Sequence, residues 1–361
     1  MLQKNLFSDV KILVCVGSGG VGKTTLAAAL GVMAAQQGLK VLVLTIDPSK
    51  RLAQTLGIEG TQEITEVPGQ KFKGQLWASV INHQKVFDDF VRKAASSANK
   101  TGVSVSAERI LKNKLYRQLS TSLSGSQEFT ALEMLCSCHE SGRFDLIILD
   151  TPPAKHAMDF LKAPQKLAAL FNEGIAQWFR TPQEGAGFFA NLLHSGTRQV
   201  LKTLENLTGA DFVRELADFF LNIEKWQNKL EQRILQVHEM LVHPQTQFCL
   251  VTSFDLAKLK EAESFAKEIR KNGYHLTSVL LNRVFPDWIL PEAAETSEDP
   301  KKIEIYRLAQ LLRFYYEHRL ELYAQFERKL SGDVLVMKLP DYVEPVSDLD
   351  GLMLIGSQLE F

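Results

Sequence analysis

The sequence predicts an α/β fold in which a doubly wound, mostly parallel sheet carries an inserted helical subdomain. Seven short apolar runs have the length and composition of buried strands. These runs cover residues 11–16, 41–46, 76–81, 144–149, 247–252, 276–281 and 333–338. Helical patterns separate most of them, and strands that alternate with helices are typical of a parallel sheet.

Two intervals between the strands, residues 82–142 and 153–245, are too long for a simple crossover and have little strand character. We predict that both are helical insertions, which together form a subdomain within a single domain of residues 1–361. The clearest helix begins at Thr208–Asp211, a pattern typical of a capping box, and runs for about thirty residues. Its apolar stripe contains Phe212, Leu216, Phe219, Ile223, Trp226, Leu230, Ile234, Val237 and Leu241.

Composition and charge narrow the functional class. The chain has 361 residues, 45% of them apolar, and a formal net charge of −1, which argues against a nucleic-acid partner. The first nine residues have no signal-peptide pattern, and no apolar stretch reaches the ~18 residues that a transmembrane segment needs. We therefore predict a cytoplasmic protein. Its four cysteines do not form a disulfide framework.

A complete phosphate-binding loop follows the first strand directly: Gly17-Ser18-Gly19-Gly20-Val21-Gly22-Lys23-Thr24. Its glycines let backbone N–H groups surround a β-phosphate, Lys23 neutralises the β and γ oxygens, and Thr24 is a ligand for Mg²⁺. A helical pattern begins at Thr25 and ends at Gly38, and a helix N-terminus attracts anions. We expect Gly19, Gly20, Val21, Gly22, Lys23, Thr24 and Thr25 to bind ATP or ADP.

Two further strands end in a carboxylate. Asp150 follows the strand 144–149 and is expected to be the second anchor for Mg²⁺ and its water shell. Asp47 follows the strand 41–46 and is expected to orient the attacking water or accept its proton. Either aspartate can also serve only to start a turn, because Pro48 and Pro152 follow closely.

Four separate motifs resemble the ArsA/GET family of P-loop ATPases, which drive arsenical pumps or act in the guided entry of tail-anchored proteins. Residues 45–52, TIDPSKRL, are similar to the first switch of the family, and residues 150–156, DTPPAKH, are similar to the second. Asn282-Arg283 resembles the adenine-recognising segment. Leu339-Pro340-Asp341 resembles the adenine-side loop, and the likeness extends over nearly the whole chain.

The resemblance implies a deviant Walker A fold and a dimer with ATP at the interface. Asp47 is then expected to position water, Lys23 to act on the phosphates, and Thr24 and Asp150 to hold Mg²⁺. The resemblance places Asn282, Arg283, Pro340 and Asp341 around the adenine. In the GET branch the helical insertions hold an apolar client or membrane-protein helix, whereas in the arsenical branch they carry thiols for a metalloid.

The sequence departs from both branches. Ser18 stands where the family has a lysine that reaches the phosphates of the opposite subunit, and a missing charge of this kind is worth roughly 10³ to 10⁵ in rate. Lys50, Arg51 and Lys155 are alternative cations, each of which can also be a solvated charge beside a turn; a related partner subunit is a third source. The paired cysteines that clamp zinc in the GET branch are absent, and Cys136 and Cys138 lie about 200° apart on one helix.

The inserted helices are rich in large apolar side chains, such as Phe171, Trp178 and Phe189. These either form the core of the subdomain or, in the segment Phe171–Leu193, belong to a mobile flap over an apolar groove.

Three functions remain. The first is a dimeric Mg-ATP-dependent ATPase that rearranges a client-binding helical surface. The second is a low-turnover regulatory subunit in a heterodimer with a related ATPase. Driving an arsenical pump is less favoured than either of these. The third is a relative of the septum-positioning and plasmid-partitioning ATPases, which the absence of a basic amphipathic C-terminal segment disfavours.

Overall fold

The computed structural model describes residues 6–46, 51–58, 63–69, 71–100, 108, 111, 126–152, 227–284, 299–330, 332–341, 346 and 348–359. The chain divides into two compact units. The sheet unit comprises Met1–Val80, Cys138–Ala157 and Leu241–Phe361, and the helical unit comprises Ile81–Ser137 and Met158–Met240. Among the described residues, no helix is both long enough and apolar enough to cross a bilayer.

Eight strands form one sheet, in the order β3-β4-β2-β5-β1-β6-β7-β8. Their bounds are β1 Ile12–Gly17, β2 Lys40–Thr45, β3 Thr65–Glu66, β4 Gln75–Val80, β5 Leu146–Asp150, β6 Thr246–Ser253, β7 His275–Val284 and β8 Leu335–Pro340. All neighbouring pairs are parallel except β3 and β4. The predicted α/β fold with a mostly parallel sheet is therefore confirmed.

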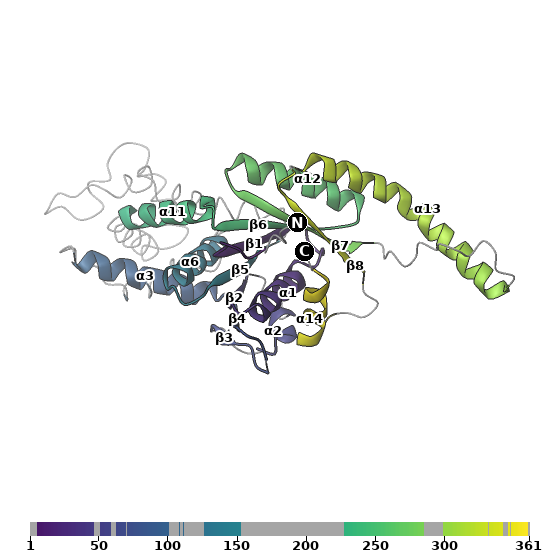
Figure 1. Cartoon of the computed structure of the whole chain (residues 1–361). Coiled ribbons are helices and arrows are strands. Elements are labelled where there is room, and N and C mark those ends of the chain that lie inside the picture. Colours follow the sequence, from purple (N-terminus) through teal and green to yellow (C-terminus); the bar gives the residue numbers. More distant parts are fainter. Residues whose placement is uncertain are drawn as a thin grey trace, which may run out of the picture. The chain divides into compact units, whose positions relative to one another are not determined.

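Helices cover both faces of this sheet (Figure 1). The helices of the sheet unit are α1 Lys23–Gln36, α2 Arg51–Thr55, α12 Leu256–Lys271, α13 Pro300–Lys329 and α14 Leu349–Gln358. Figure 1 shows α1, α2 and α14 on one side and α12 and α13 on the other. The core beneath α1 and α14 takes alternate residues of the central strands, such as Leu13, Cys15, Cys249 and Val251. This period of two is the reason why the continuous apolar runs form strands buried on both faces.

The helical unit has a small core of its own. Its described helices are α3 His83–Lys100, α6 Ser126–Glu140 and α11 Gln227–Val242, the last two of which end inside the sheet unit. The ring of Phe129 in α6 packs edge to face with those of Phe87 and Phe90 in α3. A buried ion pair joins α6 to α11, because Arg233 Nε donates to Glu133 Oε2 over 2.6 Å. Most of the second insertion, including Phe171–Leu193 and the first half of the predicted long helix, lies outside the described residues, so the subdomain boundaries stay predictions.

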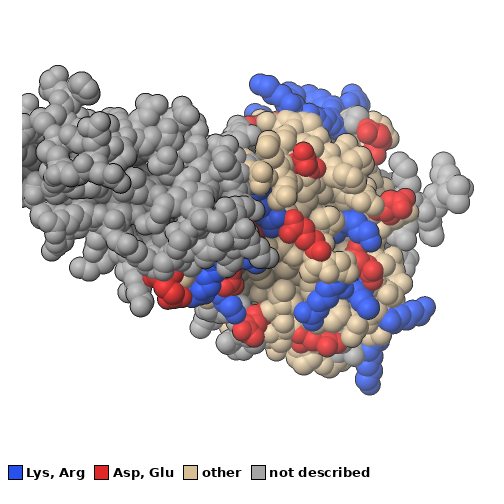
Figure 2. All heavy atoms as spheres, turned by 90° about the vertical axis from the view of Figure 1, so that its left-hand side faces the viewer, with Lys and Arg blue, Asp and Glu red and all other residues tan. Residues whose placement is uncertain are grey.

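The strand boundaries differ from the predicted ones by at most two residues, except that β7 continues three residues further, to Val284, and one strand is added. The strand β5 begins at Leu146 rather than at residue 144, because Phe144 packs against Trp77 and the Asp145 carboxylate accepts the N–H of Lys40. The strand β3 was not predicted, since two residues show no periodicity. Figure 2 shows basic and acidic side chains interspersed over the described part of one face.

Candidate functional site

The phosphate-binding loop connects the end of β1 to the start of α1. Gly17 has φ +155°, and a Cβ there would collide with the carbonyl oxygen of Val251 in β6. Gly22 caps α1 in the left-handed conformation, with φ 89° and ψ 19°. A Cβ at Gly22 would lie 2.5 Å from Asn282 Nδ2. The neighbouring strands β6 and β7 therefore require glycine at both ends of the loop.

The side chain of Lys23 is bonded to the backbone of its own loop. Its side chain is buried, and Nζ donates a hydrogen bond of 3.0 Å to the carbonyl oxygen of Ser18. The Ser18 hydroxyl donates a hydrogen bond to a residue outside the loop, the carboxylate of Glu261 in α12. Both ends of Ser18 are thus engaged, and the residue is only 4% exposed.

Asp150 ends β5, which lies between β2 and β1 in the sheet. The register places it opposite Cys15 of β1 and Thr45 of β2. Its Oδ2 accepts the Thr24 hydroxyl over 2.6 Å and the Thr45 hydroxyl over 2.9 Å, and the side chain is 1% exposed. A carboxylate and a hydroxyl in contact are hard oxygen ligands of the kind that Mg²⁺ takes beside a phosphate. The residues present therefore fit Mg²⁺.

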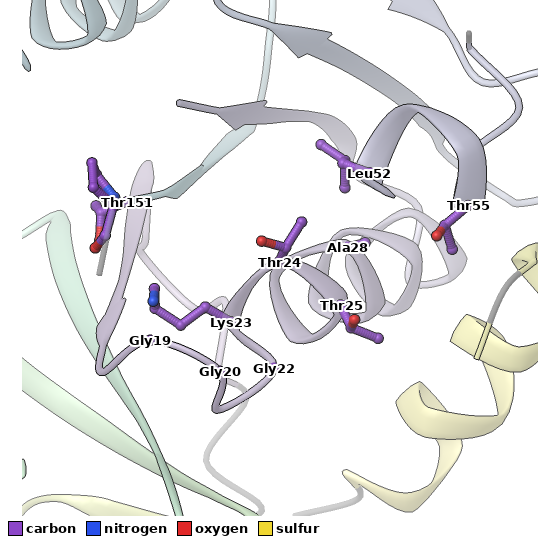
Figure 3. A pocket seen from close by; sticks show the side chains of 11 residues that line it. Gly19, Gly20, Gly22, Lys23, Thr24, Thr25, Ala28, Leu52, Thr55 and Thr151 are labelled. Carbon is purple, nitrogen blue, oxygen red and sulfur yellow. The ribbon is translucent and has the colours of Figure 1, made fainter. Parts of the chain in front are cut away.

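A pocket of about 140 Å³ opens above these residues (Figure 3). Figure 3 shows Lys23 and Thr24 pointing from the start of α1 into this space, with Leu52 and Thr151 at its borders. The lining comprises Gly19, Gly20, Gly22, Lys23, Thr24, Thr25, Ala28, Leu52, Thr55, Thr151 and Pro152. Loop amides, a helix N-terminus and one buried ammonium are groups that can bind an anion.

A second group of predicted residues meets at the ends of β7 and β8. Asn282 Nδ2 donates to the carbonyl of Val21 over 2.9 Å, and Asn282 Oδ1 accepts the N–H of Arg283. Arg283 has φ 59° and lies 3.8 Å from Asp341 in an exposed ion pair. Pro340 ends β8 beside Val284. These four predicted residues are thus close together, and Asn282 links them to the phosphate loop.

Comparison with known proteins decides the family. The family model of the anion-transporting ATPases matches residues 10–339, which include the loop, Asp150 and Asn282. The chain belongs to this family. It is therefore a member of an ATP-binding family of ATPases with the P-loop fold.

Individual relatives are distant. "Putative arsenical pump-driving ATPase 1" of Aquifex aeolicus is 24% identical over 289 residues, 78% of this chain and 65% of the relative. "ATPase GET3B" of Arabidopsis thaliana is 24% identical over 289 residues, 75% of this chain and 63% of the relative. "ATPase ASNA1 homolog" of Babesia bovis is 26% identical over 271 residues, 74% of this chain and 64% of the relative. The matches thus span less than two thirds of the length of these relatives.

Some predicted residues lie outside the described part of this family member. They are Asp47, Lys50 and Lys155, and the side chain of Arg51 is likewise not described. The water-positioning role of Asp47 and the three alternative cations therefore stay predictions. The helix α2 begins directly after this segment, and its Leu52 and Thr55 line the pocket.

Thr45, Leu52 and Thr55 were not singled out from the sequence. Thr45 does have a signal, because it ends a parallel strand next to the one that carries Asp150. Leu52 and Thr55 have no signal of their own, since an apolar or a hydroxyl side chain on a short helix is common anywhere.

All four cysteines lie among the described residues, are buried and are not in disulfides. Cys15 and Cys249 are partners in the register of β1 and β6, whereas Cys136 and Cys138 lie on α6. The hydrogen bond with Cys249 and complete burial raise the pKa of Cys15 well above its ordinary value. The shift favours the neutral thiol form of Cys15.

Proposed function

We propose that this chain binds Mg-ATP, hydrolyses it as part of a dimer, and uses the cycle to rearrange its helical unit around a client. The observation that supports this most directly is the contact of Thr24, Thr45 and Asp150 beside the phosphate loop. A buried carboxylate in contact with a hydroxyl beside a phosphate-binding loop supplies the hard oxygen ligands that Mg²⁺ takes. One of its donors, Thr24, lies in the first turn of α1 directly after the buried Lys23.

Each residue of the site has a role in this proposal. The N–H groups of Gly19–Thr25 and the Lys23 ammonium bind the phosphates, Thr24 and Asp150 hold Mg²⁺, and Asp47 orients the attacking water. Bound Mg²⁺ would neutralise phosphate charge and polarise a phosphoryl oxygen. Asn282, Arg283, Pro340 and Asp341 form the adenine side, where the Asn282 amide also fixes the loop through Val21.

A low-turnover subunit of a heterodimer is the second candidate. The observation in its favour is Ser18, which is neutral, buried and bonded to Glu261, and so offers no cation to a facing subunit. In the first candidate, the partner in the dimer is a second copy of this chain or a related ATPase. The buried cysteines give no support to metalloid capture. The client that we propose for the helical unit is an apolar helix.

The test is ATP turnover by the purified chain, with ATP binding measured in parallel. Asp47→Asn should lower turnover by about 100-fold or more while ATP still binds, because only the attacking water loses its partner. Lys23→Ala should weaken ATP binding itself. Lys267→Gln, an exposed change on α12, is the control.

Three outcomes separate the candidates. Turnover that Asp47→Asn leaves intact would remove the water-positioning role. Tight ATP binding by the wild-type chain with negligible turnover, restored by mixing with a related ATPase, would favour the regulatory subunit. No ATP binding by the wild-type chain would refute both candidates.

A further inference from the structure

One carboxylate connects the phosphate loop to a second cation. Glu261 Oε2 accepts the hydroxyl of Ser18 and also lies 3.4 Å from Lys258 Nζ. The two partners of this oxygen are far apart in the sequence, since Ser18 follows β1 and Lys258 lies in the first turn of α12. The three side chains form a Ser18–Glu261–Lys258 chain beside the anion site.

The position of Lys258 is fixed by its backbone. The Thr252 hydroxyl at the end of β6 donates to the Lys258 carbonyl over 3.1 Å. The Asp255 carboxylate caps α12 by accepting the N–H groups of Ala257 and Lys258. The start of α12 is therefore tied to the strand next to β1, so the backbone of Lys258 and Ser18 keep a defined spacing.

Helix stability does not account for this lysine. A positive side chain in the first turn of a helix opposes the helix dipole, which favours carboxylates there. An ion pair with side chains 31% and 44% exposed adds little in compensation. A role outside the helix explains the residue better.

The charge of Glu261 creates the need for such a role. A carboxylate bonded to the second residue of the phosphate loop repels the triphosphate that the loop is built to hold. This repulsion grows with the charge of the nucleotide. A lysine on the same carboxylate oxygen cancels it, while the Ser18 hydroxyl still receives its anchor.

We propose that Lys258 is a charge-compensating residue that permits Glu261 to anchor the phosphate loop without weakening the binding of nucleoside triphosphates. This inference rests on the proposed function, because it concerns the same nucleotide site. Glu261 is then a positioning residue, and neither side chain needs to touch the nucleotide. The pair makes the discrimination between triphosphate and monophosphate depend on α12.

The test measures the affinities of the full chain for ATP, ADP and AMP by isothermal titration calorimetry, without hydrolysis as a readout. Lys258→Gln should weaken ATP binding by about 3- to 10-fold, ADP binding less and AMP binding least. The loss should shrink as KCl is raised from low to high concentration, since salt screens exposed charges. Lys258→Gln combined with Glu261→Gln should bring ATP affinity back to within about twofold of wild type.

Controls isolate the charge effect. Lys267→Gln removes the cation of a second lysine–glutamate pair on α12, with a 2.9 Å contact to Glu263, and should leave the affinities unchanged. Ser18→Ala removes the hydrogen bond to Glu261 but no charge, so it should weaken the binding of ATP, ADP and AMP to a similar degree.

The outcomes of the proposal and of the function are distinct. Lys258→Gln with unchanged ATP affinity, or a double variant as weak as the single one, would refute the charge compensation while ATP binding stands. The nucleotide site would be refuted instead if the wild-type chain did not bind ATP, or if the Lys23→Ala variant bound ATP as tightly as the wild type.

Discussion

Replacing Gly22 by alanine tests whether β7 shapes the phosphate loop. The new Cβ would lie 2.5 Å from Asn282 Nδ2, closer than real Cβ contacts allow, so the amide has to move. Its hydrogen bond of 2.9 Å to the Val21 carbonyl is then lost. Gly20→Ala is the matched control, because Gly20 also has a positive φ, +79°, and a Cβ there meets nothing within 4 Å.

Both substitutions carry the same conformational cost, and only Gly22→Ala also loses a hydrogen bond. An alanine in the left-handed region costs about 1 to 2 kcal/mol in either variant. Leaving the carbonyl of Val21, a buried residue, without its donor adds about 1 to 3 kcal/mol in Gly22→Ala alone. We therefore expect the free energy of unfolding to fall by about 1 to 2 kcal/mol in Gly20→Ala and by about 2 to 5 kcal/mol in Gly22→Ala.

The assay is urea denaturation of the nucleotide-free chain, with both variants compared at the same slope of free energy against urea. Asn282→Ala removes the colliding amide, so adding Gly22→Ala to Asn282→Ala should cost only the conformational part. An equal loss in Gly20→Ala and Gly22→Ala would show that Asn282 does not constrain the loop.

Two other predictions concern buried polar contacts. Thr45→Val removes the hydroxyl that Asp150 Oδ2 accepts over 2.9 Å. We expect the apparent affinity for Mg²⁺, measured by titration in the presence of ATP, to fall by about 10-fold, whereas ATP binding in EDTA should be unaffected. An unchanged Mg²⁺ titration would show that Thr45 does not position Asp150 for the metal. Arg233→Met leaves the Glu133 carboxylate, 4% exposed, without the cation that it contacts over 2.6 Å, and should cost about 3 to 5 kcal/mol in urea denaturation of the helical unit. Lys267→Met at the exposed pair of α12 should cost under about 1 kcal/mol, and a similar loss in both variants would contradict the importance of burial.

The sheet was predictable because its signal is local. Continuous apolar runs such as residues 41–46 can only be buried on both faces, and the helical patterns between them require parallel neighbours. The two residues of β3 were missed because their place depends on the hydrogen bonds of β4, not on their own pattern.

The site was predictable only in part. The loop residues and Asp150 stand in short motifs whose chemistry can be read directly from the sequence. The role of Thr45 depends on the register between β2 and β5, which no single segment encodes. Glu261 lies 243 residues from Ser18, and nothing near it marks it as a partner of the loop. The sequence does not reveal contacts between residues that are distant along the chain and meet only in the folded structure.

The central place of β1 has a consequence for biosynthesis. Its two neighbours are β5, which ends at Asp150, and β6, which ends at Ser253. At ordinary translation rates the ribosome needs roughly 10 to 50 s after β1 to complete β6. During that time one of the most apolar segments of the chain has no strand on at least one side. The nascent polypeptide is therefore exposed to misassociation at the segment that later carries the phosphate loop, and we expect ribosome-bound chaperones to bind there first.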